Sequence, residues 1–171
     1  MNHPLEEILR NILVEREKPA FCIAGTHYSY AELGACIANI QQQIQSKGLE
    51  GNCNIGILTY DDLQTYASVF AILFSGHTFV PINPLHPKSR NESILEQAEI
   101  RVLLSSKMEE EADAFSSTST MVIKTNLPAD TSSVPAFIEQ EPNRNAYILF
   151  TSGSTGVPKG VPLTIENLES F

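Results

Sequence analysis

Short apolar segments alternate with helix-like segments along most of this chain, and this alternation restricts the fold more than any other feature. Residues 53–58, 78–82 and 100–104 have the length and composition of buried strands. Residues 63–74 and 88–97, which separate them, have helical patterns. Strands separated by helices cannot pair through tight hairpins, and this order is typical of parallel sheets. We therefore expect an α/β fold with a mainly parallel sheet flanked by helices.

Polar residues at the segment boundaries support these helices. Ser29 is followed three positions later by Glu32, which is the spacing of a capping box. Gly48 predicts a left-handed helix end. The pair Asp61 and Asp62 precedes the apolar helix at residues 63–74. This position favours helix capping over a pair of carboxylates for acid–base or metal chemistry.

The charge balance argues against several partner classes. The chain has 20 acidic and 11 basic residues among 171, with a net charge of −9. This excludes a generally basic nucleic-acid surface and disfavours anionic membranes. The longest uncharged stretch, residues 63–87, contains glycine and proline residues that would break a membrane-spanning helix. We expect neither a nucleic-acid partner nor a membrane partner.

The number and spacing of the cysteines indicate whether the protein resides in an oxidising or a reducing compartment. Cys22, Cys36 and Cys53 are odd in number and form no C-x-x-C pair, so a disulfide framework or a zinc site is not expected. The first residues have neither the basic nor the apolar region of an export signal. We expect a cytoplasmic protein whose cysteines are small, reduced and buried.

The segment at residues 151–160 carries the main functional signal. It directly follows a strong apolar strand at residues 146–150 and holds three of the nine glycines. Glycines let backbone N–H groups approach an anion, and hydroxyls donate hydrogen bonds without adding charge. Lysine adds a mobile positive charge. A loop that follows a strand lies where α/β sheets bind ligands, so we expect a polyphosphate site. Its candidate residues are Thr151, Ser152, Gly153, Ser154, Thr155, Gly156, Lys159 and Gly160.

Other interpretations of this segment are weaker. Pro158 stands where a Walker A loop needs its second glycine, so the chain is expected to continue in an extended conformation. A nucleophile elbow fails because Ser152 replaces the required glycine and no histidine follows. A flexible linker would not need Pro158-Lys159-Gly160 after a strong strand. Lys159 as a solvated surface lysine stays open, and for Arg144 a solubilising role is favoured over phosphate contact. An NAD-binding Rossmann domain lacks its G-x-G-x-x-G motif after an early strand.

Three segments resemble one enzyme family. Residues 147–160 read YILFTSGSTGVPKG and resemble the phosphate-binding signature of the adenylate-forming superfamily. That superfamily includes acyl-CoA synthetases, adenylation domains of nonribosomal peptide synthetases, luciferases and D-alanine–carrier-protein ligases. Residues 28–33 (YSYAEL) and 76–90 (GHTFVPINPLHPKSR) are similar to two further family elements. Asn83 replaces the usual aspartate but keeps a turn-forming side-chain carbonyl. Residues 161–164 and 167–171 look somewhat more like those of D-alanine–carrier-protein ligases than those of fatty acyl-CoA synthetases.

The resemblance implies an ATP-dependent ligase that acts in two steps. A carboxylate attacks the α-phosphate of Mg²⁺-bound ATP to give an acyl-adenylate, and a thiol then takes the acyl group. The implied partners are a small carboxylic or amino acid and a thiol of CoA or of a phosphopantetheinyl carrier protein. By the same resemblance, the hydroxyls and Lys159 contact the β- and γ-phosphates, whereas the glycines shape the loop.

The resemblance also implies an incomplete domain. Residues 1–171 are expected to be the N-terminal portion of an AMP-binding (adenylation) domain, which ends at the phosphate-binding loop and the start of the next helix. The family's metal-binding glutamate, ribose-binding aspartate, acid-specificity pocket and C-terminal lysine would all follow Phe171. We therefore expect the chain alone to be inactive and to self-associate through uncovered apolar surface. The alternative is a non-catalytic anion-binding or assembly module.

Overall fold

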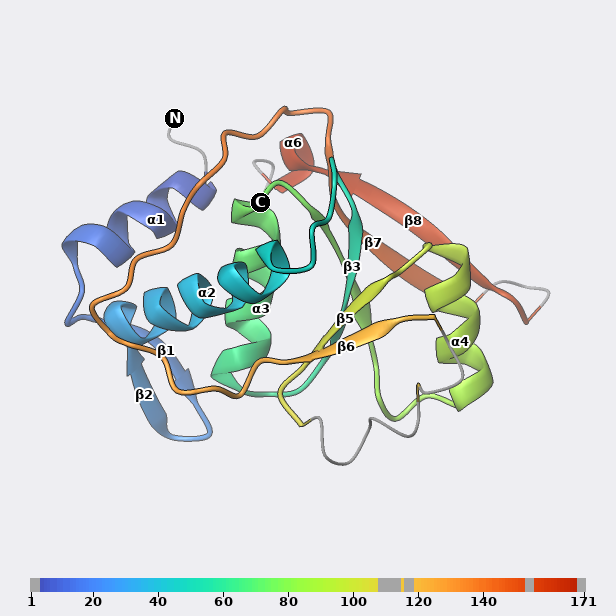
Figure 1. Cartoon of the computed structure of the whole chain (residues 1–171), viewed down its shortest axis with the longest axis horizontal. Helices are drawn as coiled ribbons and strands as arrows, with labels where there is room; N and C mark the ends of the chain where they lie inside the picture. Colours follow the sequence, from blue (N-terminus) through green and yellow to red (C-terminus); the bar gives the residue numbers. More distant parts are fainter. Residues whose placement is uncertain (1–3, 108–114, 116–118, 153–155, 169–171) are drawn as a thin grey trace.

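The computed structural model describes residues 4–107, 115, 119–152 and 156–168. Figure 1 shows how the helices and strands of this part of the chain are arranged. In chain order they are α1 Pro4–Val14, β1 Pro19–Ile23, β2 Thr26–Ser29, α2 Tyr30–Gln45, β3 Asn54–Leu58, α3 Leu63–Phe74, β4 Thr78–Ile82, α4 Lys88–Gln97, β5 Val102–Ser105, β6 Met121–Lys124, β7 Asn145–Ser152, β8 Pro158–Thr164 and α6 Ile165–Leu168.

A six-stranded sheet with the order β6-β5-β3-β4-β7-β8 forms the centre of the fold. All neighbouring strands from β6 to β7 are parallel, and only β8 runs antiparallel to its neighbour β7. β1 and β2 form a separate antiparallel hairpin. The expected α/β fold with a mainly parallel sheet is therefore confirmed. Because β3, β4, β5, β6 and β7 are parallel, their carboxyl ends all lie at one edge of the sheet, and we call this the carboxyl edge.

Side chains of alternating direction divide the core into two layers, as the period of a β-strand requires. Ile55 and Ile57 of β3 belong to the layer beneath α1, α2 and α3. Leu58 of β3 belongs to the layer beneath α4, together with Leu103 of β5. Figure 1 shows α2 and α3 on one side of the sheet and α4 on the other. Gly56 lets the side chain of Leu103 pack directly against the backbone of β3, since a Cβ atom at Gly56 would lie 2.7 Å from Leu103 Cδ1.

The helix starts follow the polar signals in the sequence. Ser29 Oγ accepts a hydrogen bond from Glu32 N at 3.2 Å, and Glu32 Oε2 accepts one from Ser29 N at 2.7 Å, which completes the expected capping box. Of the two neighbouring aspartates, Asp62 is the residue that caps α3. Gly48 has a φ of +62° after the end of α2. These local predictions are confirmed.

The connection from β6 to β7 is long and irregular, but it is held against the helices. Gln41 of α2 donates to Ala136 O at 2.9 Å and accepts from Ala136 N at 3.0 Å. Ile138 N donates to Phe74 O at 2.9 Å, and the Phe137 ring meets the Phe74 ring edge-on. In Figure 1 this connection is the orange trace that runs round the N-terminal end of α2 and past α1.

The cysteines differ from expectation in one respect. Cys22, Cys36 and Cys53 are all free thiols. Cys36 and Cys53 are half-buried, but Cys22 is exposed, so the expectation that all three are buried is wrong. Cys22 alternates with Phe21 and Ile23, which pack inward from β1, and it therefore points outward. Burial raises the pKa of the Cys36 thiol, with a further contribution from Glu32. Within the described residues, no helix is long and apolar enough to cross a membrane.

Candidate functional site

The segment singled out in the sequence lies at the carboxyl end of β7. β7 and β8 pair in an antiparallel ladder in which Thr151 faces Lys159 and Ser152 faces Pro158. The predicted site residues Gly153, Ser154 and Thr155 lie outside the described residues. The other five are described, and the ladder brings the two sides of the loop together. Because β7 is parallel to β4, these residues lie at the carboxyl edge.

A hydroxyl and an ammonium group share one face of this ladder. Thr151 and Lys159 are directly opposite one another, and side chains in that relation lie on the same face of a sheet. Both are exposed, as are Ser152 and Gly156. Thr151 Oγ1 donates a long hydrogen bond of 3.4 Å to Lys159 O. Within the described part of the chain, Lys159 has no ion-pair partner. The ammonium group is therefore available to an anion.

Two of the predicted positions, Gly156 and Gly160, require glycine for different structural reasons. Gly156 has a φ of +81° and open space around it, so it supplies a left-handed conformation in the turn. Gly160 lies inside β8 rather than in the loop. A Cβ atom at Gly160 would lie 3.0 Å from Phe150 Cζ and 3.1 Å from Ile148 Cγ2. Gly160 therefore makes room for side chains of β7 that pack toward α4. Lys159 also lies in β8.

The turn after β4 lies next to this site, because β4 is the parallel neighbour of β7. Asn83 Oδ1 accepts a hydrogen bond from Leu85 N at 2.9 Å, which is the turn-forming contact expected for this side chain. Asn91 of α4 is buried, and its Nδ2 donates to Asn83 O at 3.0 Å. These two bonds hold the turn and the start of α4 in a defined position beside the end of β7.

A polar cluster at the ends of β3 and β5 was not anticipated from the sequence. Asp62 Oδ1 accepts from Thr65 N at 2.8 Å, whereas Asp62 Oδ2 accepts from Ser106 Oγ at 2.5 Å. Lys107 Nζ lies 4.6 Å from the centre of the Tyr60 ring. The cluster ties neighbouring strands together at the carboxyl edge. A polar residue directly after each apolar strand is the sequence signal that could have indicated it.

Arg144 lies at the opposite edge of the sheet from the glycine-containing segment. It immediately precedes β7, and its Nη2 donates to His77 O at 3.0 Å. The side chain is half-buried, and burial lowers its pKa from the ordinary value. The preference for a solubilising surface charge is therefore wrong, and a phosphate contact at the loop is also excluded for the described conformation. Arg144 instead anchors the start of β4.

The described residues contain no group of three His, Cys, Asp or Glu side chains that could hold a metal ion. At the end of β7 the described residues offer exposed hydroxyls, the ammonium group of Lys159 and a turn containing a left-handed glycine, and this combination suits an anion. Such a site binds and orients a charged group.

Comparisons with known proteins agree with this geometry. The model of the AMP-binding enzyme family matches residues 10–171. Nonribosomal peptide synthetase 8 of Aspergillus fumigatus is 32% identical over 149 residues, which cover 85% of this chain and 2% of that protein. Nonribosomal peptide synthetase penN of Penicillium thymicola is 32% identical over 162 residues, which cover 91% of this chain and 6% of that protein.

A solved structure shows the same fold. The crystal structure of the nonribosomal peptide synthetase FmoA3 in its α-methyl-L-serine-AMP-bound form aligns with a TM-score of 0.80 and 24% identity. The alignment covers 96% of this chain and 19% of that one. The fold is therefore that of the N-terminal subdomain of adenylate-forming enzymes. The chain spans only a small fraction of the length of these curated relatives.

Proposed function

Because this chain belongs to the AMP-binding enzyme family, we propose that it supplies the ATP-phosphate-binding part of a ligase that activates a small carboxylic or amino acid as its adenylate. The observation that carries this proposal is the pairing of Thr151 with Lys159 at the carboxyl end of β7. This pairing supports a phosphate site because it presents a hydroxyl donor and, on the same face, an ammonium group that has no ion-pair partner among the described residues, beside a turn that contains Gly156.

These side chains fit the phosphates of ATP by their chemistry. Thr151 and Ser152 can donate hydrogen bonds to phosphate oxygens, and Lys159 can neutralise part of the negative charge. Ser154 and Thr155 would add two hydroxyls, and Gly153 a backbone N–H group. The role of such a site is to hold the reacting group in position and to stabilise charge on oxygen. Magnesium belongs to the proposal as the ion that accompanies ATP, and no residue of this chain is assigned to it.

An amino acid is the favoured substrate, since the similar proteins are nonribosomal peptide synthetases and one solved structure holds α-methyl-L-serine-AMP. The thiol acceptor in the proposal is a phosphopantetheinyl carrier protein, with CoA as the alternative. We place this chemistry in the cytoplasm. The 171-residue chain alone is not proposed to catalyse either step, because none of its described residues is assigned a role beyond phosphate binding.

The proposal is tested by ATP–pyrophosphate exchange with a panel of amino and carboxylic acids. The protein to use is one in which this chain is continued by the rest of its adenylation domain. We expect exchange that depends on one acid or a small group of acids, and none from the 171-residue chain alone. Absence of exchange with every acid would refute the ligase and favour a non-catalytic anion-binding module. Exchange by the 171-residue chain alone would show that it needs no further residues.

A further inference from the structure

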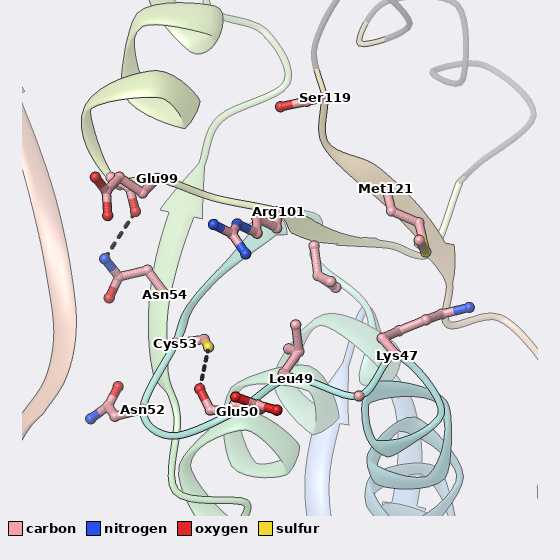
Figure 2. A pocket seen from close by; sticks show the side chains of 13 residues that line it. Lys47, Leu49, Glu50, Asn52, Cys53, Asn54, Glu99, Arg101, Ser119 and Met121 are labelled. Carbon is pink, nitrogen blue, oxygen red and sulfur yellow. Dashed lines mark hydrogen bonds between the residues drawn. The ribbon is translucent and has the colours of Figure 1, made fainter.

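A pocket lies at the edge of the sheet opposite the proposed phosphate site. It is formed where β3, β5 and β6 begin, and it has a volume of about 800 Å³. β3 has five residues, so the Cα atoms of its first and last residues are about 13 Å apart at the usual rise per residue. The pocket and the carboxyl edge are therefore separate places on the molecule. Figure 2 shows the pocket from close by.

Two positive and two negative side chains line this pocket. They are Lys47, Glu50, Glu99 and Arg101. Figure 2 places Arg101 at the centre of the view, with Glu99 and Lys47 on opposite sides of it. Among the described residues, neither Arg101 nor Lys47 has an ion-pair partner. Four charged groups of both signs thus surround one cavity without neutralising one another directly.

The wall of the pocket is fixed by hydrogen bonds. Asn54 Nδ2 donates to Ala98 O at 2.9 Å, which joins β3 to the end of α4. Met121 N donates to Arg101 O at 2.8 Å, so the backbone that carries Arg101 is held by β6. Cys53 Sγ donates to Glu50 O at 3.3 Å. The charged side chains therefore extend from an ordered frame.

Uncharged side chains complete the lining. Leu49, Val102 and Met121 contribute apolar surface, and Asn52 and Ser119 contribute polar groups. A cavity of this size is within the range of small-molecule sites. A purely anionic ligand would be repelled by Glu50 and Glu99, and a metal cation would be repelled by Arg101 and Lys47. A ligand that carries one positive and one negative charge can be attracted by both the acidic and the basic side chains of the pocket.

We propose that this pocket binds a small zwitterion of the amino-acid class. The carboxylate of the ligand pairs with Arg101, and its ammonium group pairs with Glu50. Its side chain lies toward Leu49, Val102 and Met121. The guanidinium group of Arg101 suits a carboxylate because its donors can bind both oxygens. This site is independent of the proposed phosphate site, since the two lie at opposite edges of the sheet.

The first test is an NMR titration of the ¹⁵N-labelled chain with each of the common free L-amino acids. We expect at least one to shift the amide signals of residues 47–54 and 98–102, with a Kd of about 1 mM or tighter. The N-acetyl and carboxamide derivatives of that amino acid each lack one charge and should bind at least about tenfold more weakly. If no amino acid shifts these signals, the pocket does not bind amino acids. If either derivative binds as tightly as the free amino acid, the claim that both charges of the ligand are recognised is wrong.

Exposed charged residues allow matched variants. Arg101→Gln and Glu50→Gln should each weaken binding by at least about tenfold. Arg10→Gln and Glu7→Gln change the same residue types on α1, away from the pocket, and should leave binding unchanged. A thermal melt of each variant shows whether the fold is kept. Unchanged affinity in Arg101→Gln would overturn the proposal. Loss of ATP binding at the carboxyl edge would not affect it, so the two proposals fail separately.

Discussion

His77 is a buried titratable residue at the amino end of β4. It is 8% exposed, and its Nδ1 accepts a hydrogen bond from Cys53 N at 3.3 Å. Burial lowers its pKa from the ordinary value of 6.5, and the nearby positive charge of Arg144 lowers it further. Both causes disfavour the imidazolium form, and protonation would also remove the acceptor that Cys53 N uses.

Folding stability should therefore depend on the protonation of His77. Below pH 6.5 the unfolded chain binds a proton at this residue while the folded chain resists it. The contribution to the free energy of unfolding is present above pH 6.5 and decreases as the pH falls toward the folded pKa. Urea unfolding at several pH values should show this decrease in the native chain.

His77→Asn is the matched variant, because its amide oxygen can replace Nδ1 as acceptor but does not titrate. The difference in unfolding free energy between native chain and variant should change between pH 7.5 and pH 5, with the native chain losing more on acidification. A difference that stays constant over this range would mean that His77 is protonated equally in both states.

At the scale of elements, the two oxygens of Asp62 join a helix to a neighbouring strand. One oxygen caps α3 through Thr65 N, and the other accepts the hydroxyl of Ser106 after β5. Asp62→Ala should lower the free energy of unfolding by about 1–2 kcal/mol, the upper part of the range for a lost helix cap. Ser106→Ala removes only the second bond and should cost less. Chemical denaturation measures both, and equal losses would show that the cap is not the larger contribution.

Gln41 should control the mobility of the connection between β6 and β7. Its amide makes both hydrogen bonds to Ala136 and a third to Ser75 Oγ at 3.2 Å. Gln41→Met keeps the length of the side chain but removes these bonds, so amide exchange at residues 134–138 should become faster by at least about fivefold. Gln42→Met, at an exposed neighbouring position, is the control. Unchanged exchange in Gln41→Met would show that apolar packing alone holds the connection.

Local features of the fold could be predicted from the sequence, whereas long-range features could not. Three features could be predicted: the capping box at Ser29, the alternation of strands and helices, and the extended chain after Pro158. Each depends on residues that are close in sequence or on the spacing of apolar residues. The order of the strands could not be predicted in this way. The contact between Asp62 and Ser106 and the burial of Arg144 depend on that order. They bring together residues that are 44 and 67 positions apart.

The candidate site, too, has local features that could be predicted from the sequence and long-range features that could not. The glycines and hydroxyls of the segment were visible in the sequence, but the position of Gly160 within β8 was not. The room that Gly160 leaves for Phe150 and Ile148 follows from the cross-strand register of β7 and β8. The roles of residues 151–160 toward phosphate remain a prediction.

At the scale of the whole molecule, the β7–β8 ladder exposes apolar side chains. Leu149 and Val161 are opposite one another in the ladder and are 42% and 44% exposed. Such a pair favours association between copies of the chain. Sedimentation velocity should show concentration-dependent association of the native chain and less of it for the double variant Leu149→Thr, Val161→Thr. Leu13→Thr, which changes an exposed apolar residue of α1, is the control. A native chain that remains monomeric at all concentrations would contradict this prediction.

The central claim is that the carboxyl end of β7 binds the phosphates of ATP. Its most direct test is kcat/KM for ATP in pyrophosphate exchange, measured on the adenylation domain that continues this chain. Lys159→Ala should lower this value by at least about tenfold, which corresponds to about 1.4 kcal/mol of transition-state stabilisation. Lys18→Ala, an exposed lysine before β1, should leave it unchanged. Equal values for Lys159→Ala and the native protein would contradict the claim.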